Sequence, residues 1–263
     1  MRHGLKATAG KSAPKLALSI LFLSILPTLS TLAGARHFTY LYEAPTSAPG
    51  SVELENTITW ARTNDAGAHF DDVGIREELE IGITPHFQLG IYPLDWAYHR
   101  ASDADGGFSY DGGAVELIYN LSNPVVDPIG ISIYEEISAG RRHFESESKL
   151  IAQKNFGRLI LDYNLTLEAE SAEQGLMEHD GEVQQALGAS YELSPRMSVG
   201  IELLHEFLFP DWRDEEKIRN VFVGPNVSYR QGNWFITVTA LAQATNTEDE
   251  ADFQVRTIFG IGL

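Results

Sequence analysis

Charged side chains recur at alternate positions of short apolar segments, and their types and spacing could do chemistry. Glu53 and Glu55 form one such pair, and Arg76, Glu78 and Glu80 form a triplet. Acids outnumber bases in the complete set, and rings of carboxylates favour cations over anions in a pore. We therefore expect these residues to line a passage for small solutes that prefers cations. The candidate lumen residues are Glu53, Glu55, Arg76, Glu78, Glu80, Glu116, Glu136, Asp162, Glu168, Glu202, Arg230 and Arg256.

The same charged groups have a second interpretation, in which they pair with one another and fill a narrow interior. About eight strands give a filled barrel and about sixteen give a channel. A barrel of intermediate size leaves both possibilities open. The solute itself does not follow from these residue types.

Other chemistry has weaker support in the sequence. There is no cysteine, which excludes disulfides and thiolate metal sites. No Gly-x-Ser-x-Gly elbow, phosphate loop or zinc spacing occurs, so we expect no enzyme, no cofactor and no specific metal site. His205, near the outer end of a predicted strand, is the one candidate for a rim hydrolase. Acidic clusters at 211–216 and 248–250 could bind divalent cations, but solvated charge explains them more simply.

The element that positions these side chains is a β-strand with one apolar and one polar face. In residues 159–169, Leu159, Leu161, Tyr163 and further apolar residues alternate with polar ones. A period of two indicates a strand of this kind. A change of phase at Tyr92 and Pro93 predicts a β-bulge there. About twelve strands are expected, starting near residues 51, 73, 87, 113, 129, 148, 158, 183, 197, 220, 233 and 252.

The connections between these strands alternate between long and short. The long loops hold 20 acidic residues, and the short turns hold one, Asp127. Successive connections of an up-and-down barrel lie at opposite ends, so length and charge sort by end of the molecule. Outer-membrane barrels have short periplasmic turns and longer outer loops. The sequence therefore predicts an all-β, transmembrane up-and-down antiparallel barrel. A soluble β-sandwich or lipocalin-like barrel, with its apolar face inward, is the alternative architecture.

The first 35 residues are typical of a signal peptide. A basic start is followed by the apolar residues 16–32 and by the small residues Ala33, Gly34 and Ala35. We expect cleavage after Ala35 and a location in the outer membrane of a Gram-negative cell. The alternative is an N-terminal membrane anchor, for which the apolar run is short. We further expect residues 36–50 to form a periplasmic or plug segment and residues 51–263 to form the barrel.

Charge limits the partners of the mature chain. Four of the 19 basic residues and none of the 37 acidic ones lie in residues 1–35, which leaves a formal charge of −22. Such a charge argues against nucleic acid as a partner. The expected partners are outer-membrane lipid and lipopolysaccharide, the barrel assembly machinery and a small solute. The oligomeric state stays open.

Several short motifs resemble those of outer-membrane transporters of the phenol-degradation meta-pathway type. They are the aromatic lead 38–43, the Pro49-Gly50 step, the first strand 51–55, the turn 194–196 before a Val-Gly-Ile strand, and the ending 256–263. The resemblance implies a β-barrel that moves small, often hydrophobic, compounds. The chain departs from the pattern by ending in Leu263, where many such barrels end in Phe.

Three hypotheses follow. The leading one is a passive, porin-like channel for small solutes. The second is a non-conducting structural or adhesive barrel whose acidic outer loops bind a ligand or ions. The third is a rim hydrolase that uses His205.

Overall fold

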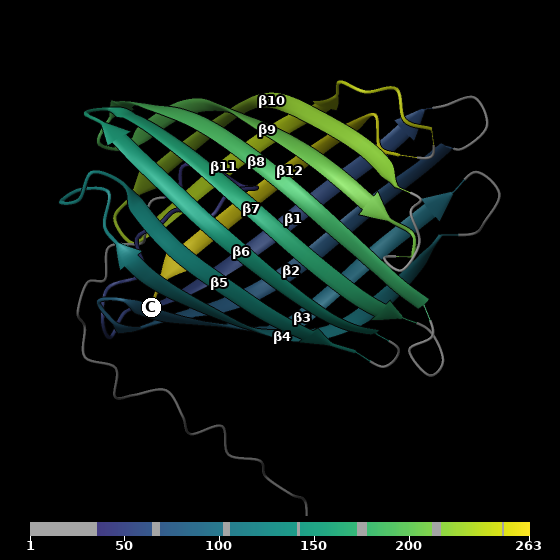
Figure 1. Ribbon diagram of the computed structural model, residues 1–263, viewed down its shortest axis with the longest axis horizontal. Coiled ribbons are helices and arrows are strands. Elements are labelled where there is room, and N and C mark those ends of the chain that lie inside the picture. Colours follow the sequence, from purple (N-terminus) through teal and green to yellow (C-terminus); the bar gives the residue numbers. More distant parts are fainter. Residues whose placement is uncertain are drawn as a thin grey trace, which may run out of the picture.

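Twelve antiparallel strands form a closed barrel in the computed structural model (Figure 1). The structure describes residues 36–64, 69–101, 106–140, 143–172, 178–211, 217–248 and 250–263. Each strand pairs with its neighbours in chain order, and β1 also pairs with β12, which confirms the predicted barrel. The strands are β1 (Val52–Asn64), β2 (His69–Thr84), β3 (Phe87–Ala101), β4 (Gly107–Ser122), β5 (Gly130–Ala139), β6 (His143–Phe156), β7 (Leu159–Ala172), β8 (Glu178–Ser194), β9 (Met197–Phe209), β10 (Ile218–Gln231), β11 (Trp234–Gln243) and β12 (Phe253–Gly262).

The short turns lie together at one end of the barrel, which we call the inner end. The C-terminus lies at this end, on the left of Figure 1. Two of the turns place a glycine in the left-handed region, Gly157 and Gly232, each with φ 64°. Glycine adopts this conformation without the steric cost that a Cβ brings. The longer connections therefore lie at the opposite, outer end, as the alternation of lengths predicts.

Four strands begin earlier than predicted at the outer end. β2, β4, β6 and β8 start at His69, Gly107, His143 and Glu178, not near residues 73, 113, 148 and 183. Backbone pairing in a hairpin does not require apolar side chains, so the ladders continue past the apolar part of each strand. The outer connections are correspondingly shorter than the predicted loops.

A register shift interrupts β3, at the predicted place. Pairing with β4 is irregular between Tyr92 and Asp95, next to Pro93, which has no N–H to donate. The irregularity keeps the apolar side chains on one face across it. Ile91 and Leu94, on its two sides, are 37 % and 47 % exposed.

The barrel wall carries its apolar side chains outward. Along β5, Ile133 and Ile137 are 48 % and 42 % exposed, whereas Ser132 and Glu136 are 0 % and 2 % exposed. A soluble barrel would show the reverse, with its apolar face inward. Exposed large apolar side chains recur on the outward faces of β1 to β10 and of β12, as in barrels that contact lipid. The soluble alternatives of the sequence analysis are therefore wrong.

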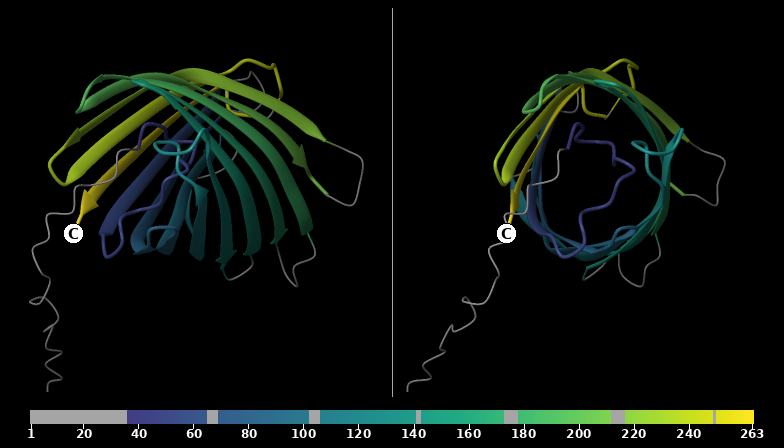
Figure 2. Two further views of the ribbon diagram at one scale, coloured as in Figure 1. Left: turned by 60° about the vertical axis from the view of Figure 1, so that its left-hand side comes forward. Right: turned by 90° about the vertical axis from the view of Figure 1, so that its left-hand side faces the viewer.

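Residues 36–50 lie inside the barrel. The right-hand view of Figure 2 shows this purple segment within the ring of strands. Phe38, Leu41 and Ala44 are at most 1 % exposed. No helix in the described part of the chain is long and apolar enough to cross a membrane.

Candidate functional site: the barrel lumen and its internal segment

The internal segment, residues 36–50, is bonded to the wall mainly by wall side chains that bind its backbone. Glu202 on β9 accepts the backbone N–H groups of Thr39, at 3.0 Å, and Tyr40, at 2.8 Å. The same carboxylate accepts hydrogen bonds from Asn226 Nδ2, at 2.8 Å, and Thr239 Oγ1, at 2.5 Å. Four donors thus hold a fully buried carboxylate. Glu202 therefore acts as an anchor for the segment.

Amide side chains hold the next residues of the internal segment. Asn164 accepts the N–H of Tyr42 at 2.7 Å and donates to its carbonyl at 3.0 Å. Gln153 accepts the N–H of Ala44 at 2.9 Å, and Asn120 donates to the carbonyl of Ala44 at 2.7 Å. These bonds satisfy backbone groups that would otherwise be buried without partners. Side chains of the wall thus hydrogen-bond the backbone of the segment, as the backbone of a neighbouring strand would in a sheet.

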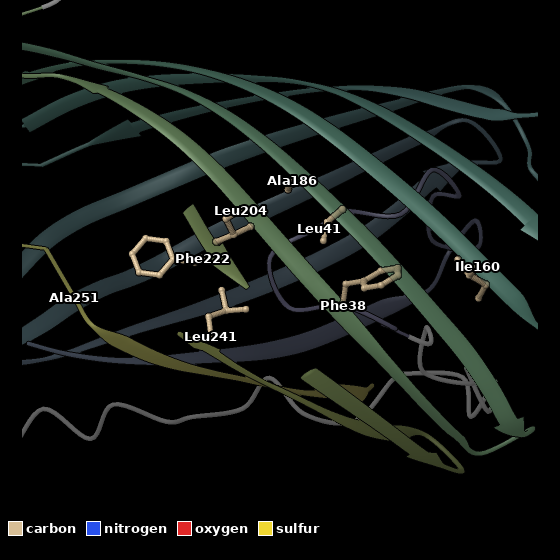
Figure 3. Close-up of a cluster of buried hydrophobic side chains, with 8 residues drawn as sticks. All are labelled: Phe38, Leu41, Ile160, Ala186, Leu204, Phe222, Leu241 and Ala251. Atoms are coloured by element: carbon tan, nitrogen blue, oxygen red, sulfur yellow. The ribbon is translucent and has the colours of Figure 1, made fainter. Parts of the chain in front are cut away.

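An apolar cluster fixes the middle of the internal segment. Phe38 lies over Gly188, where an added Cβ would come within 2.6 Å of the ring. The cluster comprises Phe38, Leu41, Ile160, Ala186, Leu204, Phe222, Leu241 and Ala251 (Figure 3). Inward-facing apolar residues such as Phe222 were not predicted, because alternation alone assigns every inward position to the polar face. The apolar pair Phe38 and Leu41 was the available signal, since buried apolar groups require apolar partners.

Arg36 begins the described chain and brings a cation into the lumen. Its Nε lies 3.2 Å from Glu55 Oε1 on β1. Its carbonyl accepts hydrogen bonds from Ser228 and Thr237, at 2.7 and 2.6 Å. Its guanidinium lies 4.6 Å from the centroid of the Tyr42 ring. Both ends of this residue are therefore bonded to the wall or to the segment itself.

Two cavities lie on either side of Arg36 and Tyr42, which line both of them. The outer cavity has a volume of about 440 Å³ and is lined by Glu78, Glu147 and Glu168 among other residues. The inner cavity has a volume of about 180 Å³ and is lined by Glu53, Glu55 and Glu80, with Glu43 of the segment. The internal segment therefore divides the lumen, and carboxylates line both parts.

The predicted lumen residues all belong to inward-facing positions or to the rim. Glu53, Glu55, Glu78, Glu80, Glu116, Glu136, Asp162 and Glu202 are at most 7 % exposed. Arg76, Glu168 and Arg256 are half-buried and line the outer cavity. Arg230 lies at the inner end, where its Nε donates to the carbonyl of Pro195 at 2.7 Å. Their part in transport stays a prediction.

Five of the predicted glutamates form a row across the sheet together with Glu147 and Glu182. Opposite partners are Glu55 and Glu78, Glu116 and Glu136, Glu136 and Glu147, Glu147 and Glu168, and Glu168 and Glu182. Gly90 of β3 is the opposite partner of Glu80 and of Glu116, and the Glu78 carboxylate reaches over it. We call Glu55, Glu78, Glu116, Glu136, Glu147, Glu168 and Glu182 the carboxylate row. It begins near the inner end of β1 and finishes near the outer end of β8, because the strands of a barrel are tilted.

Internal cations accompany the row on aromatic surfaces. Arg76 lies 2.7 Å from Glu136, 2.8 Å from Asp95 and 4.2 Å from the ring centroid of Tyr92. Such stacking of a cation on a ring adds attraction in a desolvated site. The predicted arginine thus binds an acid of the row rather than lining the lumen alone.

Lys149 repeats this arrangement with an ammonium group. Its Nζ lies 2.7 Å from Glu147 Oε1 and 5.0 and 4.7 Å from the ring centroids of Tyr42 and Tyr134. Neither Lys149 nor Glu147 was predicted as a lumen residue. Both belong to residues 143–153, where outward Ser146 and Ser148 replace the apolar residues that mark other strands.

Three carboxylates near the outer end of the row lie close together. One oxygen from each of Glu145, Glu168 and Glu170 lies within 4.8 Å of the others. Carboxylate oxygens are ligands that hard cations prefer. The expectation of no metal site therefore stays a prediction. The acidic cluster at 211–216 and that at 248–250 lie partly outside the described residues.

His205 faces outward, and its ring is hydrogen-bonded to an arginine. Its Nε2 accepts a hydrogen bond from Arg219 Nε at 2.9 Å, and its ring lies 4.5 Å from that of Phe207. The ring nitrogen that a general base would offer to a substrate is thus already in a hydrogen bond. This contact gives no support to the hydrolase hypothesis. That the chain is not an enzyme stays a prediction.

A family model matches residues 30–256, and it describes a family of unknown function, DUF6662. The chain belongs to DUF6662. The match covers the internal segment as well as the strands to β12. No curated protein matches this DUF6662 chain. The finer resemblance to the phenol-degradation type stays a prediction.

Solved structures similar to this DUF6662 chain are outer-membrane barrels. An outer-membrane channel from Pseudomonas putida F1 has a TM-score of 0.66 and 8 % identity, covering 86 % of this chain and 100 % of that one. The β domain of the Bordetella autotransporter BrkA has a TM-score of 0.55 and 11 % identity, covering 82 % and 100 %. The NanC porin has a TM-score of 0.52 and 8 % identity, covering 81 % and 100 %. At such identities the likeness establishes the fold.

Proposed function

We propose that this chain is a channel of the bacterial outer membrane that passes small solutes and prefers cations. The observation that carries the proposal is the carboxylate row, which runs inside an apolar-faced barrel from one end to the other. Rings of carboxylates concentrate cations in a pore. The similar structures, which include an outer-membrane channel and a porin, support the location and the class.

The internal segment acts as a plug in this proposal. It stands between the two cavities, so solutes pass only when it shifts or through the space beside it. Its anchors are hydrogen bonds, the ion pair of Arg36 with Glu55 and two apolar clusters, which are reversible contacts. The chain therefore has a low conductance for a barrel of twelve strands.

Planar-bilayer recordings test the channel. Purified protein that shifts in heat-modified electrophoresis is inserted between unequal KCl solutions, and the reversal potential is measured. Discrete conductance steps with a reversal potential of the sign for K⁺ preference are expected. A folded barrel without conductance steps would refute the channel, and a preference for Cl⁻ would refute the role of the row.

A non-conducting barrel is the second candidate, and the internal segment itself favours it. Residues 36–50 divide the lumen and are hydrogen-bonded to polar side chains that point into it, among them Glu202, Asn164 and Gln153. Conductance with and without the segment distinguishes the two candidates. A non-conducting barrel stays silent both with the segment and after its removal, whereas a plugged channel conducts more after removal.

A further inference from the structure

Three buried glutamates of the carboxylate row have an oxygen without a hydrogen-bond partner among the described residues. The atoms are Glu55 Oε2, Glu78 Oε1 and Glu116 Oε1. These side chains are 1 %, 4 % and 0 % exposed. Glu202, equally buried, has four donors on its two oxygens. A buried acceptor without a donor costs free energy, so these three oxygens are suited to a donor from outside the chain.

Pairing brings the three glutamates together. Glu55 and Glu78 are opposite partners on β1 and β2. Glu78 Oε1 lies 2.6 Å, and Glu116 Cδ 3.2 Å, from the position that a Cβ on Gly90 would occupy. Both side chains thus pack against the backbone of Gly90, which brings the Glu78 and Glu116 carboxylates together. Glu78 also lines the outer cavity, which gives this cluster an approach from outside.

The surroundings are suited to an ammonium group. Arg36 neutralises part of Glu55, and the hydroxyls of Tyr42 and Tyr92 donate to the other oxygen of Glu116, at 3.1 and 2.7 Å. Negative charge therefore exceeds positive charge at this place. Lys149 shows that the same lumen holds an alkylammonium between a carboxylate and two tyrosine rings.

A bare metal ion fits less well. Metal ions require several ligand atoms close to one another. The close carboxylate group found in the described residues is Glu145, Glu168 and Glu170, not these three. An ammonium bears three N–H donors on a compact charge and reaches separate acceptors.

We propose that Glu55, Glu78 and Glu116 form a binding site for the ammonium group of a small aliphatic amine that enters from the outer cavity. A linear diamine is the favoured ligand, because Glu168, a further carboxylate of the row, lines the same outer cavity as Glu78. This site deepens the proposed function by naming the class of solute.

Calorimetric titration of the detergent-solubilised mature protein with 1,4-diaminobutane tests the site. The wild type is expected to bind the diamine and not 1,4-butanediol, which has the same length without charge. Glu78→Gln is expected to weaken binding at least tenfold. Its matched control is Glu135→Gln, which changes an outward-facing glutamate that accepts bonds from Ser146 and Ser148.

Gly90→Ala removes no charge, but its Cβ would displace the Glu78 and Glu116 side chains that pack there, so it is also expected to weaken binding at least tenfold. Gly107→Ala is its control, because an added Cβ there meets nothing within 4 Å. Equal affinity in Glu78→Gln, or equal binding of the diol, would overturn the proposal. KCl conductance of the same preparations separates the two conclusions. Conductance without diamine binding refutes the site alone, and diamine binding without conductance refutes the channel alone.

Discussion

At the scale of the residue, the lumen contains two kinds of buried glutamate. Glu202 is surrounded by donors from the internal segment and from the wall, so it serves to hold the segment. Glu78 and Glu116 each have an oxygen without a hydrogen-bond partner in the part of the chain that the structure describes. The same residue type thus serves structure at one place and recognition at another, and the hydrogen-bond partners decide which.

Replacing Glu202 by Ala is expected to loosen the internal segment. The N–H groups of Thr39 and Tyr40 would lose their acceptor, at a cost of about 1–3 kcal/mol for each buried donor. Single-channel recordings should show more frequent or longer openings, while heat-modified electrophoresis shows the barrel intact. Glu135→Ala is the control, and openings unchanged from wild type in Glu202→Ala would contradict the anchoring role.

His37 gives the segment a dependence on pH. Its Nδ1 lies 2.9 Å from Glu43 and its Nε2 3.7 Å from Glu192. Burial lowers the pKa of His37, but attraction to the two carboxylates outweighs burial and the nearby Arg230, so the pKa lies above its ordinary value. The added stability of docking is complete below about pH 6.5, the ordinary pKa, and is lost as pH rises through the raised pKa.

Openings should therefore increase as pH rises above about 6.5, because the imidazolium loses its proton. The measurement is the open fraction of single channels across this range, compared between wild type and His37→Gln. The variant should show a flatter profile. An identical rise in both proteins would assign the effect to other groups.

At the scale of the element, the internal segment was the least predictable part. Its residues suggested either a plug or a periplasmic tail, because a single sequence does not say where a short aromatic segment docks. The strands were predictable, because the alternation of apolar and polar residues indicates which face of each strand contacts lipid. Inward Leu204, Phe222 and Leu241 broke that rule, because they pack on Phe38 and Leu41 rather than facing water.

Removing the internal segment is expected to raise conductance severalfold. A variant that lacks residues 36–48 retains all twelve strands, and the two cavities would join. Phe38→Ala is a milder second variant, because removal of a fully buried phenylalanine costs about 3–5 kcal/mol. Planar-bilayer conductance checks both, and wild-type conductance in both would show that the segment does not restrict passage.

At the scale of the whole molecule, the outward apolar face determines the medium in which the barrel folds. The wall exposes residues such as Ile133, at 48 %, on eleven of its twelve strands. Contiguous apolar surface of this extent is rare on soluble monomers. The signal peptide and the cleavage site after Ala35 lie outside the described residues and stay predictions, as do the partners.

Ile133→Arg is expected to destabilise the folded barrel in lipid by about 2–4 kcal/mol, the cost of an arginine near the middle of a bilayer. Urea titration in lipid vesicles, followed by heat-modified electrophoresis, measures the change. Val126→Arg is the control, because Val126 is 80 % exposed in an inner turn. Equal losses in both variants would mean that the wall does not face hydrocarbon.

The pairing of β1 with β12 has a consequence for biogenesis. Until β12 is in place, the sheet has two free edges, each a row of unpaired N–H and C=O groups. The anchors of the internal segment lie on strands from β1 to β12, so the full set is not assembled in a half-built sheet. Edge protection and docking are thus both late events. A chaperone that shields the first strand until the last arrives would prevent premature edge pairing and would also leave residues 36–50 free to enter the finished lumen.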